Sequence, residues 1–164
     1  MEYVLRCFNQ EKMDKINIMF IQANEYASGY YRIGFIAEEL KKDPRFNVDL
    51  YQRGDDSHGF LFRMGKADIV VFQLQTNDVV KDVMPVLKQQ GILVVMDMDD
   101  DLLDVPKWNP AYFGLGRKFT HLHDAWGDGR FMDIKANKKR LRNIVTMLRG
   151  VDLITVTGVG LRDS

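Results

Sequence analysis

Four carboxylates follow one apolar run in the middle of the chain. Residues 92–96 are continuously apolar, and Asp97, Asp99, Asp100 and Asp101 come directly after them. Carboxylate oxygens are ligands for Mg²⁺, and D-x-D pairs at strand ends serve in phosphohydrolases and in some sugar transferases. Adjacent carboxylates can also raise one another's pKa and thereby supply a general acid or base. The spacing of Asp97 and Asp99 therefore suits either a metal site or acid–base chemistry.

The same cluster has a structural interpretation. Asp97 could accept hydrogen bonds from loop amides, while residues 99–101 begin a short helix that carries Leu102 and Leu103. Carboxylates suit such a position because the N-terminal end of a helix dipole is positive. The residues alone leave all these interpretations open.

A second candidate is the polar segment 22–32, which follows the first apolar run. It is neither G-x-G-x-x-G nor a P-loop, so it predicts no dinucleotide or triphosphate site. Ser28 and Gly29 would allow close backbone approach to an anion at a helix start, and Arg32 could add a bidentate phosphate contact. A helix cap, a turn glycine and a surface arginine would explain the same residues.

A long segment at 103–132 is rich in glycine, proline and aromatic residues, as functional lids and loops often are. His121 and His123 lie two residues apart, which could suit a transition metal, although no third ligand has an obvious spacing. Either could instead be a base or an ordinary surface histidine. Trp108 and Tyr112 could stack on sugar rings or form a small core of the loop itself.

A basic run precedes the last apolar stretch. It comprises Lys135, Lys138, Lys139, Arg140 and Arg142. These cations could meet an anionic acceptor, such as a phospholipid-linked glycan, or a membrane surface. A solvated helix face explains them without a further assumption.

The bulk composition limits the classes of protein. At 164 residues, with 46% hydrophobic and 28% charged, the chain fits one soluble domain. Basic and acidic residues balance at 23 each, so no overall charge points to nucleic acid or to an anionic membrane. The only cysteine, Cys7, cannot form an intramolecular disulfide, and neither a signal peptide nor a membrane-spanning run is present. We therefore expect a cytoplasmic protein.

Five runs of strand length alternate with helical periodicity. The expected strands cover 16–21, 48–50, 68–74, 92–96 and 151–156. The expected helix faces are Ile33, Ile36, Ala37 and Leu40, then Val79, Val83 and Leu87, then Ile134, Leu141, Val145 and Leu148. Pro85 predicts a kink or a late start in the second of these helices, and Gly91 is placed to end it.

This alternation predicts an α/β fold: a doubly wound, mainly parallel, Rossmann-like sheet with helices on both faces. In such sheets ligands bind beyond the carboxyl ends of the strands, near the switch in strand order. The polar segments 22–32, 73–77 and 97–104 should therefore share one edge.

Four segments taken together resemble the N-terminal domain of a GT-B glycosyltransferase. They are SGYYRIGFIAEEL (28–40), ADIVVFQLQ (67–75), LKQQGILVVMDMDDDL (87–102) and GVDLITVTGVGL (150–161). The likeness is to the bacterial and phage-type enzymes related to the large retaining group that builds surface polysaccharides. Order and spacing match over roughly 16–161.

The resemblance implies two Rossmann-like domains, with the nucleotide-sugar donor held mainly by the C-terminal one and the acceptor by the N-terminal one. Carried onto this chain, Ser28, Gly29 and Arg32 would lie at the interdomain cleft near the donor phosphates. Asp99, Asp100 and Asp101 would border the acceptor site. From side-chain chemistry we add Trp108 and Tyr112 to the expected acceptor contacts. The catalytic residue is not identified, and its candidates are Asp99, Asp100, His121 and His123. The resemblance implies no metal, because GT-B enzymes generally do not need a D-x-D metal. It implies no cofactor either, because the nucleotide-sugar is a co-substrate.

The expected organisation is an N-terminal extension at 1–15 and an acceptor-side domain at 16–164. The chain ends just after its last expected strand, so we expect a fragment whose C-terminal donor domain is its missing partner and which alone is inactive. Two alternatives stay open: a Mg²⁺-dependent phosphohydrolase or phosphotransfer domain using Asp97 and Asp99, and a non-catalytic α/β binding module.

Overall fold

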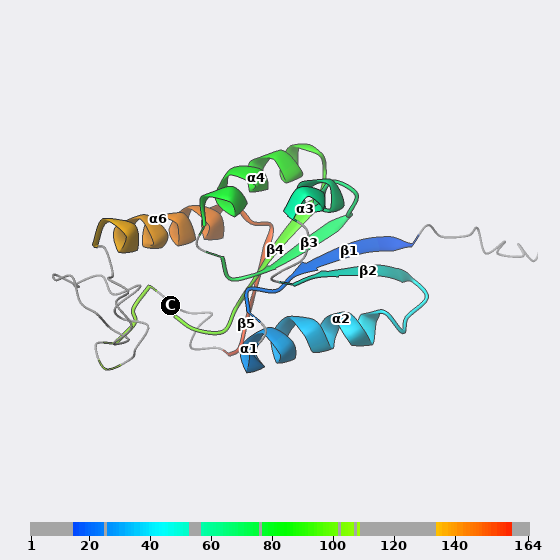
Figure 1. Cartoon of the computed structure of the whole chain (residues 1–164), viewed down its shortest axis with the longest axis horizontal. Coiled ribbons are helices and arrows are strands. Elements are labelled where there is room, and N and C mark those ends of the chain that lie inside the picture. Colours follow the sequence, from blue (N-terminus) through cyan, green and yellow to red (C-terminus); the bar gives the residue numbers. More distant parts are fainter. Residues whose placement is uncertain are drawn as a thin grey trace, which may run out of the picture.

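The computed structural model describes residues 15–24, 26–52, 57–75, 77–101, 103–106, 108 and 134–158. These residues form a single parallel sheet with helices on both of its faces (Figure 1). The predicted α/β class is confirmed. In the described part of the chain, no helix has the length and apolar character needed to cross a membrane.

The sheet contains all five predicted strands. They are β1 (Ile16–Ile21), β2 (Phe46–Tyr51), β3 (Ile69–Gln73), β4 (Leu93–Met98) and β5 (Leu153–Val156). Every neighbouring pair is parallel, in the order β2-β1-β3-β4-β5. The chain moves outward from β1 to β2 and then returns to the other side of β1, so the switch point lies between β1 and β3. This is one of the two common orders of doubly wound sheets.

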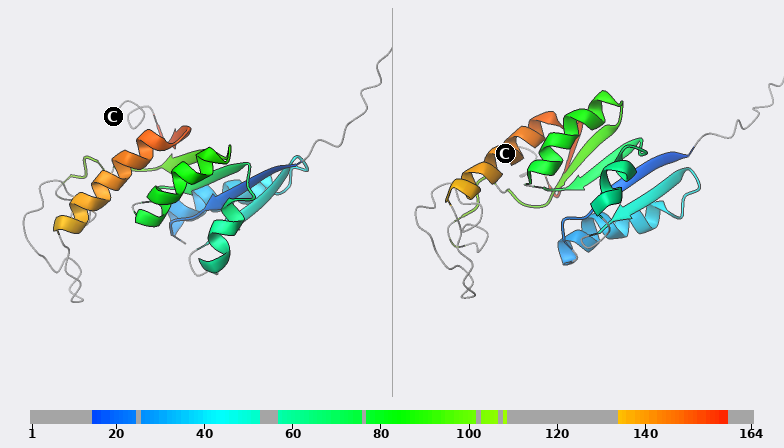
Figure 2. Two further views of the ribbon diagram at one scale, coloured as in Figure 1. Left: turned by 90° about the horizontal axis from the view of Figure 1, so that it is seen from above. Right: turned by 45° about the horizontal axis from the view of Figure 1, so that its top comes forward.

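The helices divide between the two faces (Figure 2). On one face lies a continuous helical segment made of α1 (Ala27–Gly29), the π-helix η1 (Tyr30–Gly34) and α2 (Phe35–Leu40). On the other face lie α3 (Ser57–Met64), α4 (Asp78–Gln89) and α6 (Ile134–Gly150). The sequence did not predict α3, a helix of 8 residues with a glycine inside it.

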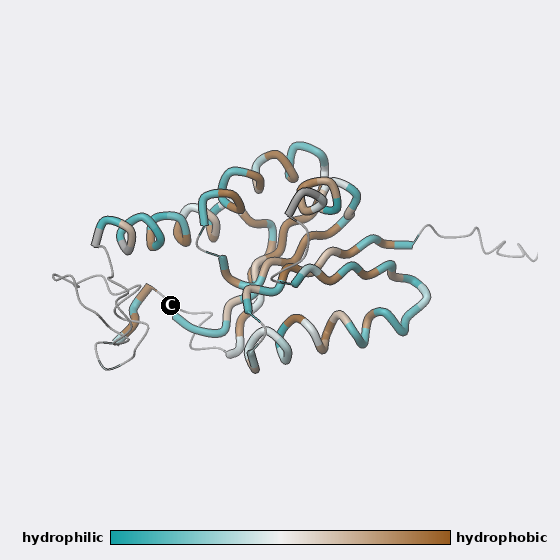
Figure 3. Tube along the Cα trace, viewed as in Figure 1, coloured by the Kyte–Doolittle hydropathy of each residue, from teal (hydrophilic) through white to brown (hydrophobic). Residues whose placement is uncertain are grey.

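Successive strand residues supply two separate cores. The larger core lies under α3, α4 and α6 and contains Met19, Ile21, Val70, Phe72, Val94 and Met96. The smaller core lies under α2 and contains Ile18, Phe20, Ile33 and Ala37. Because the central strands are covered on both faces, they read as continuous apolar runs, which are seen along the middle of Figure 3.

Two of the predicted helix faces need correction. Ile36 is 43% exposed and Val79 is 59% exposed, although both were expected to face the core. Ile33 and Ala37 are buried and Leu40 packs against the same core, so Ile36 lies at the exposed margin of this helix face. In α4 the methionine Met84, which the prediction left out, takes a buried place beside Val80 and Leu87.

The ends of α4 follow local chemistry. Asn77 caps its start, with the side-chain oxygen accepting from the Val80 amide at 2.9 Å. Pro85 therefore lies inside the helix, and the predicted late start is wrong. Gly91 follows the helix with a φ of 79°, a conformation that favours glycine, so its predicted role is confirmed. In α6 the innermost side chains are Ile144 and Met147, which the predicted stripe omitted.

Candidate functional site

The carboxyl ends of the strands bring the three polar segments to one edge, as predicted. Gln73 pairs with Asp97 in the ladder between β3 and β4. The Gln73 side chain accepts a hydrogen bond from the Ala23 amide at 2.9 Å, which ties the end of β3 to the loop after β1. Gln22 and Gln73 are both buried, and neither side chain was among the predicted site residues. We call this region the carboxyl edge.

An ion pair joins the helical segment after β1 to the end of β4. The Arg32 guanidinium donates from Nε to Asp97 Oδ2 at 2.6 Å and from Nη2 to Asp97 Oδ1 at 2.5 Å. The Thr155 hydroxyl on β5 donates to the same Oδ1 at 2.6 Å. Side-chain exposure is 18% for Arg32 and 8% for Asp97, so the pair is largely withdrawn from water. It holds η1, β4 and β5 together.

The electrostatics of Arg32 follow from this geometry. Its hydrogen bonds with Asp97 raise its pKa above the ordinary value, against the opposing effect of burial, and the charges of Asp97 and Asp99 add to the rise. Arg32 therefore stays cationic at any accessible pH.

Asp97 is poorly placed to bind a metal. Both of its oxygens already accept hydrogen bonds, and the guanidinium occupies the side from which a cation would approach. Among the described residues, no group of three or more histidine, cysteine, aspartate or glutamate side chains is placed to hold a metal ion. The structural interpretation had assigned loop amides as partners of Asp97, whereas its side-chain partners are Arg32 and Thr155.

The carboxylates after Asp97 differ in their surroundings. Asp99 is half-buried, and its backbone carbonyl accepts from the Thr157 hydroxyl at 3.3 Å. Asp100 is exposed. Asp101 accepts from the amides of Leu103 and Asp104 at 2.9 and 3.2 Å. Residues 99–101 and 103–106 form bends and a turn rather than the short helix considered above, because Asp101 closes the turn.

Ser28 and Gly29 build the loop in front of this edge. The side-chain Nδ2 of Asn24 donates to the Ser28 hydroxyl at 3.2 Å. A Cβ added to Gly29 would lie 1.8 Å from the Asn24 carbonyl oxygen, so only glycine fits. The structure thus explains Gly29 by close packing of the helix on its own loop. A role of Ser28, Gly29 and Arg32 toward donor phosphates stays a prediction.

Four exposed aromatic side chains lie within six positions of Arg32 in the sequence, and none of them was among the predicted site residues. Exposure is 82% for Tyr26, 43% for Tyr30, 69% for Tyr31 and 47% for Phe35. Tyr30 and Tyr31 make an edge-to-face contact with their ring centroids 5.4 Å apart. The π-helix runs through this segment, and π-turns occur frequently at functional sites. The repeated aromatic spacing was visible in the sequence, but the segment had been treated as a polar turn.

The remaining predicted site residues divide in two. Trp108 is described and is 82% exposed, as a stacking residue would be. Tyr112, His121 and His123 lie outside the described residues, as does Cys7.

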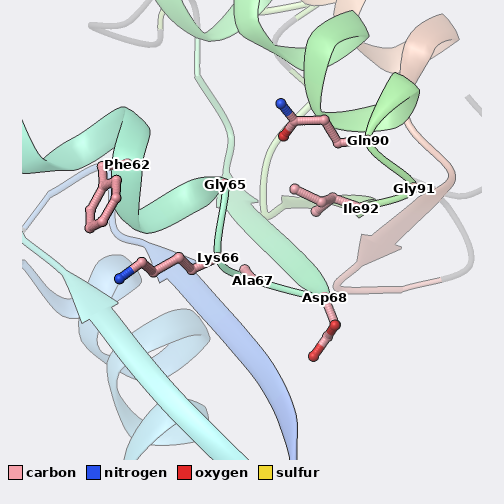
Figure 4. Close-up of a pocket in the computed structure, with 8 residues that line it drawn as sticks. All are labelled: Phe62, Gly65, Lys66, Ala67, Asp68, Gln90, Gly91 and Ile92. Atoms are coloured by element: carbon pink, nitrogen blue, oxygen red, sulfur yellow. The ribbon is translucent and has the colours of Figure 1, made fainter.

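A hollow of about 540 Å³ lies at the opposite edge, where α3 and α4 end and β3 and β4 begin. In Figure 4, Lys66 reaches toward Phe62, and Asp68 points away from Gln90. The Lys66 ammonium lies 4.0 Å from the centre of the Phe62 ring, and Asp68 accepts two hydrogen bonds from Asn17. The charged groups that line this hollow are thus held by internal contacts and do not point toward a common ligand position. The carboxyl edge is therefore the better candidate for a functional site.

These features define a doubly wound α/β domain with a polar and aromatic carboxyl edge. The sequence matches no protein-family model, and a comparison with curated proteins finds no match. The fold by itself does not decide the function, because this architecture supports many activities.

Proposed function

We propose that this chain is the acceptor-side domain of a GT-B-type glycosyltransferase. Joined to a C-terminal donor domain, it would transfer a sugar from a nucleotide-sugar to a glycan or a lipid-linked acceptor. The proposal rests on the ordered segments that resemble this family and on the chemistry of the carboxyl edge. One observation carries it: the segment that contains Arg32 bears exposed aromatic rings and meets the end of β4, where Asp99 and Asp100 follow the Arg32–Asp97 ion pair.

This combination suits a sugar acceptor. Aromatic faces such as those of Tyr26 and Tyr31 pack against the C–H faces of sugar rings, while their hydroxyl groups remain free for hydrogen bonds. Asp99 and Asp100 can accept hydrogen bonds from sugar hydroxyls, and either could take the proton of an attacking hydroxyl. Trp108 would add a further stacking surface.

Arg32 has a second possible contact. Asp97 takes two of its N–H donors, and the others remain for a phosphate oxygen. The ion pair would thus orient Arg32 toward donor phosphates, with Asp97 as a positioning residue.

The Mg²⁺-dependent phosphohydrolase is the weaker alternative. Its mechanism requires Asp97 to coordinate the metal, and in the structure that carboxylate is already bound by Arg32 and Thr155. A non-catalytic binding module would use the same aromatic residues. Only an experiment that measures sugar transfer distinguishes it from a transferase.

The test begins with binding of the chain to a printed array of bacterial oligosaccharides. We expect specific binding that weakens at least ten-fold when Asp99→Asn and Asp100→Asn are combined, since each lost charged hydrogen bond contributes on the order of 1.5–3 kcal/mol. The matched control combines Glu38→Gln and Asp82→Asn, which change exposed carboxylates on α2 and α4 and should leave binding unchanged.

A second measurement separates the classes of function. Phosphatase turnover that requires Mg²⁺ and is abolished by Asp97→Asn with Asp99→Asn would overturn the transferase proposal. The chain can also be mixed with a donor domain and a nucleotide-sugar. Oligosaccharide binding without sugar transfer in that mixture would instead indicate a binding module.

A further inference from the structure

The charge of α6 is one-sided. Its 17 residues include six basic side chains and no acidic one. Five of the six are exposed on the helix: Lys135, Lys138, Lys139, Arg142 and Arg149. Their spacing of three, one, three and seven residues places them on a single side, opposite the buried Ile144 and Met147. We call these five residues the cationic face of α6.

Three of these five cations have no acidic partner among the described residues. Lys139 pairs with Asp78 at 2.5 Å. Within the described ranges, Lys138, Arg142 and Arg149 make no ion pair. Together α4, α6 and Asp152 carry eight basic residues against the three acidic residues of this layer, a net charge of 8 − 3 = +5, whereas the whole chain is neutral. The fold has therefore gathered positive charge on one layer.

An apolar groove of about 380 Å³ runs between α4 and α6, which lie side by side in Figures 1 and 2. Its lining residues are Lys81, Met84, Pro85, Lys88, Thr146, Met147 and Gly150. Both lysines form ion pairs with carboxylates: Lys81 lies 3.1 Å from Asp82, and Lys88 lies 2.9 Å from Asp152.

The groove and the cationic face lie next to each other on the outer side of the α4–α6 layer. Thr146 is exposed between Arg142 and Arg149 on α6 and also lines the groove. The layer therefore offers separated cations beside an apolar furrow.

We propose that the α4–α6 layer docks the chain on an anionic membrane surface. The cationic face of α6 binds lipid phosphates, and the groove accepts an apolar chain from the bilayer interface. Each basic residue near such a surface contributes about five-fold to partitioning. This docking is peripheral and does not depend on whether the carboxyl edge binds sugars.

A nucleic acid would be a poorer occupant. Single strands stack their bases on aromatic rings, and the cationic face carries none. The apolar groove would also remain unused against a phosphate backbone, whereas a bilayer interface supplies both kinds of contact.

The experiment measures flotation of the full chain with vesicles. Vesicles of phosphatidylglycerol mixed with phosphatidylcholine should carry the chain, and vesicles of phosphatidylcholine alone should not. Combining Lys138→Gln, Arg142→Gln and Arg149→Gln should lower partitioning on the order of 100-fold. The control combines Lys15→Gln, Lys41→Gln and Lys66→Gln, which remove equal charge from exposed positions elsewhere, and should change it by less than about five-fold.

The groove is tested at its rim. Thr146→Asp should lower partitioning by about five-fold or more because it places a negative charge between the cations, while Thr146→Ser should leave it unchanged. Equal flotation with both kinds of vesicle, or no effect of the triple α6 variant, would overturn the proposal. Tighter binding to DNA at the same phosphate concentration would overturn it as well and assign the face to nucleic acid.

Discussion

Arg32 and Arg142 show how differently the same side chain can be used in two regions. At the carboxyl edge, Arg32 is largely buried and both of its contacts go to Asp97. On α6, Arg142 is exposed and makes no ion pair within the described residues. The first guanidinium joins three elements of the fold, whereas the second is available to a partner.

The two regions also differ in the sign of their spare charge. At the end of β4 that Arg32 contacts, the charged groups without an ion pair among the described residues include Asp99 and Asp100. On the α4–α6 layer the spare groups are basic. The net charge of zero for the chain is therefore the sum of two oppositely charged surfaces. The acidic surface would select a hydroxyl-rich ligand, and the basic surface would select an anionic ligand.

The largest contrast should come from deleting the two arginines. Arg32→Ala leaves Asp97 without its counter-charge at a largely buried position, which should lower the free energy of unfolding by about 3 kcal/mol. Arg142→Ala should change it by less than about 0.5 kcal/mol, since the side chain is exposed. Urea unfolding of both variants measures the difference.

A double variant checks the cause of that loss. Arg32→Met combined with Asp97→Asn removes both charges, and it should be less destabilised than the sum of the single variants. Additive losses would show that Arg32 stabilises the fold by packing alone, and the contrast between the two regions would then lose its electrostatic basis.

Glycines provide a second contrast. Gly29→Ala places a Cβ 1.8 Å from the Asn24 carbonyl oxygen, so the backbone must move. We expect the free energy of unfolding to fall by about 2–3 kcal/mol, at the upper end for overpacking.

At Gly150, which ends α6, an added Cβ would have its nearest contact at an ordinary 3.7 Å, to the end of Met84. Gly150→Ala should be neutral or stabilising by up to about 1 kcal/mol. Thermal unfolding compares the two, and equal effects would contradict the tight packing assigned to Gly29.

The smallest effect concerns an exposed ion pair of the α4–α6 layer. Hydrogen bonds from Lys139 first, and then from Asn143, hold the pKa of Asp78 below its ordinary 3.8. Because the folded pKa is depressed, any stabilisation is present above pH 3.8 and is lost as the pH falls through the folded value. Titration by NMR should show the Asp78 pKa rising in Lys139→Gln while staying below 3.8, since Asn143 still donates. An unchanged pKa would contradict the pair.

Much of the fold could be predicted from sequence because its signals are local. The run Ile16–Ile21 and its four counterparts are apolar and of strand length, and a polar segment follows each of the central ones. Parallel strands must end at one edge, so the position of the candidate site followed directly. The acidic residues after β4 lie at that edge, as expected.

Other features had no local signal. Arg32 and Asp97 are 65 positions apart, and nothing in either neighbourhood indicates their pairing. Nothing in residues 30–34 predicts the π-helix η1, and Ile36 is 43% exposed although Ile33 and Ala37 on the same helix face are buried. The short α3, with Gly59 inside it, is held by contacts such as that between Phe60 and Tyr51.

The sequence by itself determined the strands, the parallel architecture, the polar edge and the excess of positive charge on α6, because periodicity, composition and charge are written residue by residue. Only the tertiary structure decided which charges neutralise one another. Folding brought Arg32 within 2.5 Å of Asp97 and away from water, while the cations of α6 were left beside a groove that exists only where two helices meet. Pairing and grooves depend on distances between remote segments, and those distances are set by packing of the whole sheet.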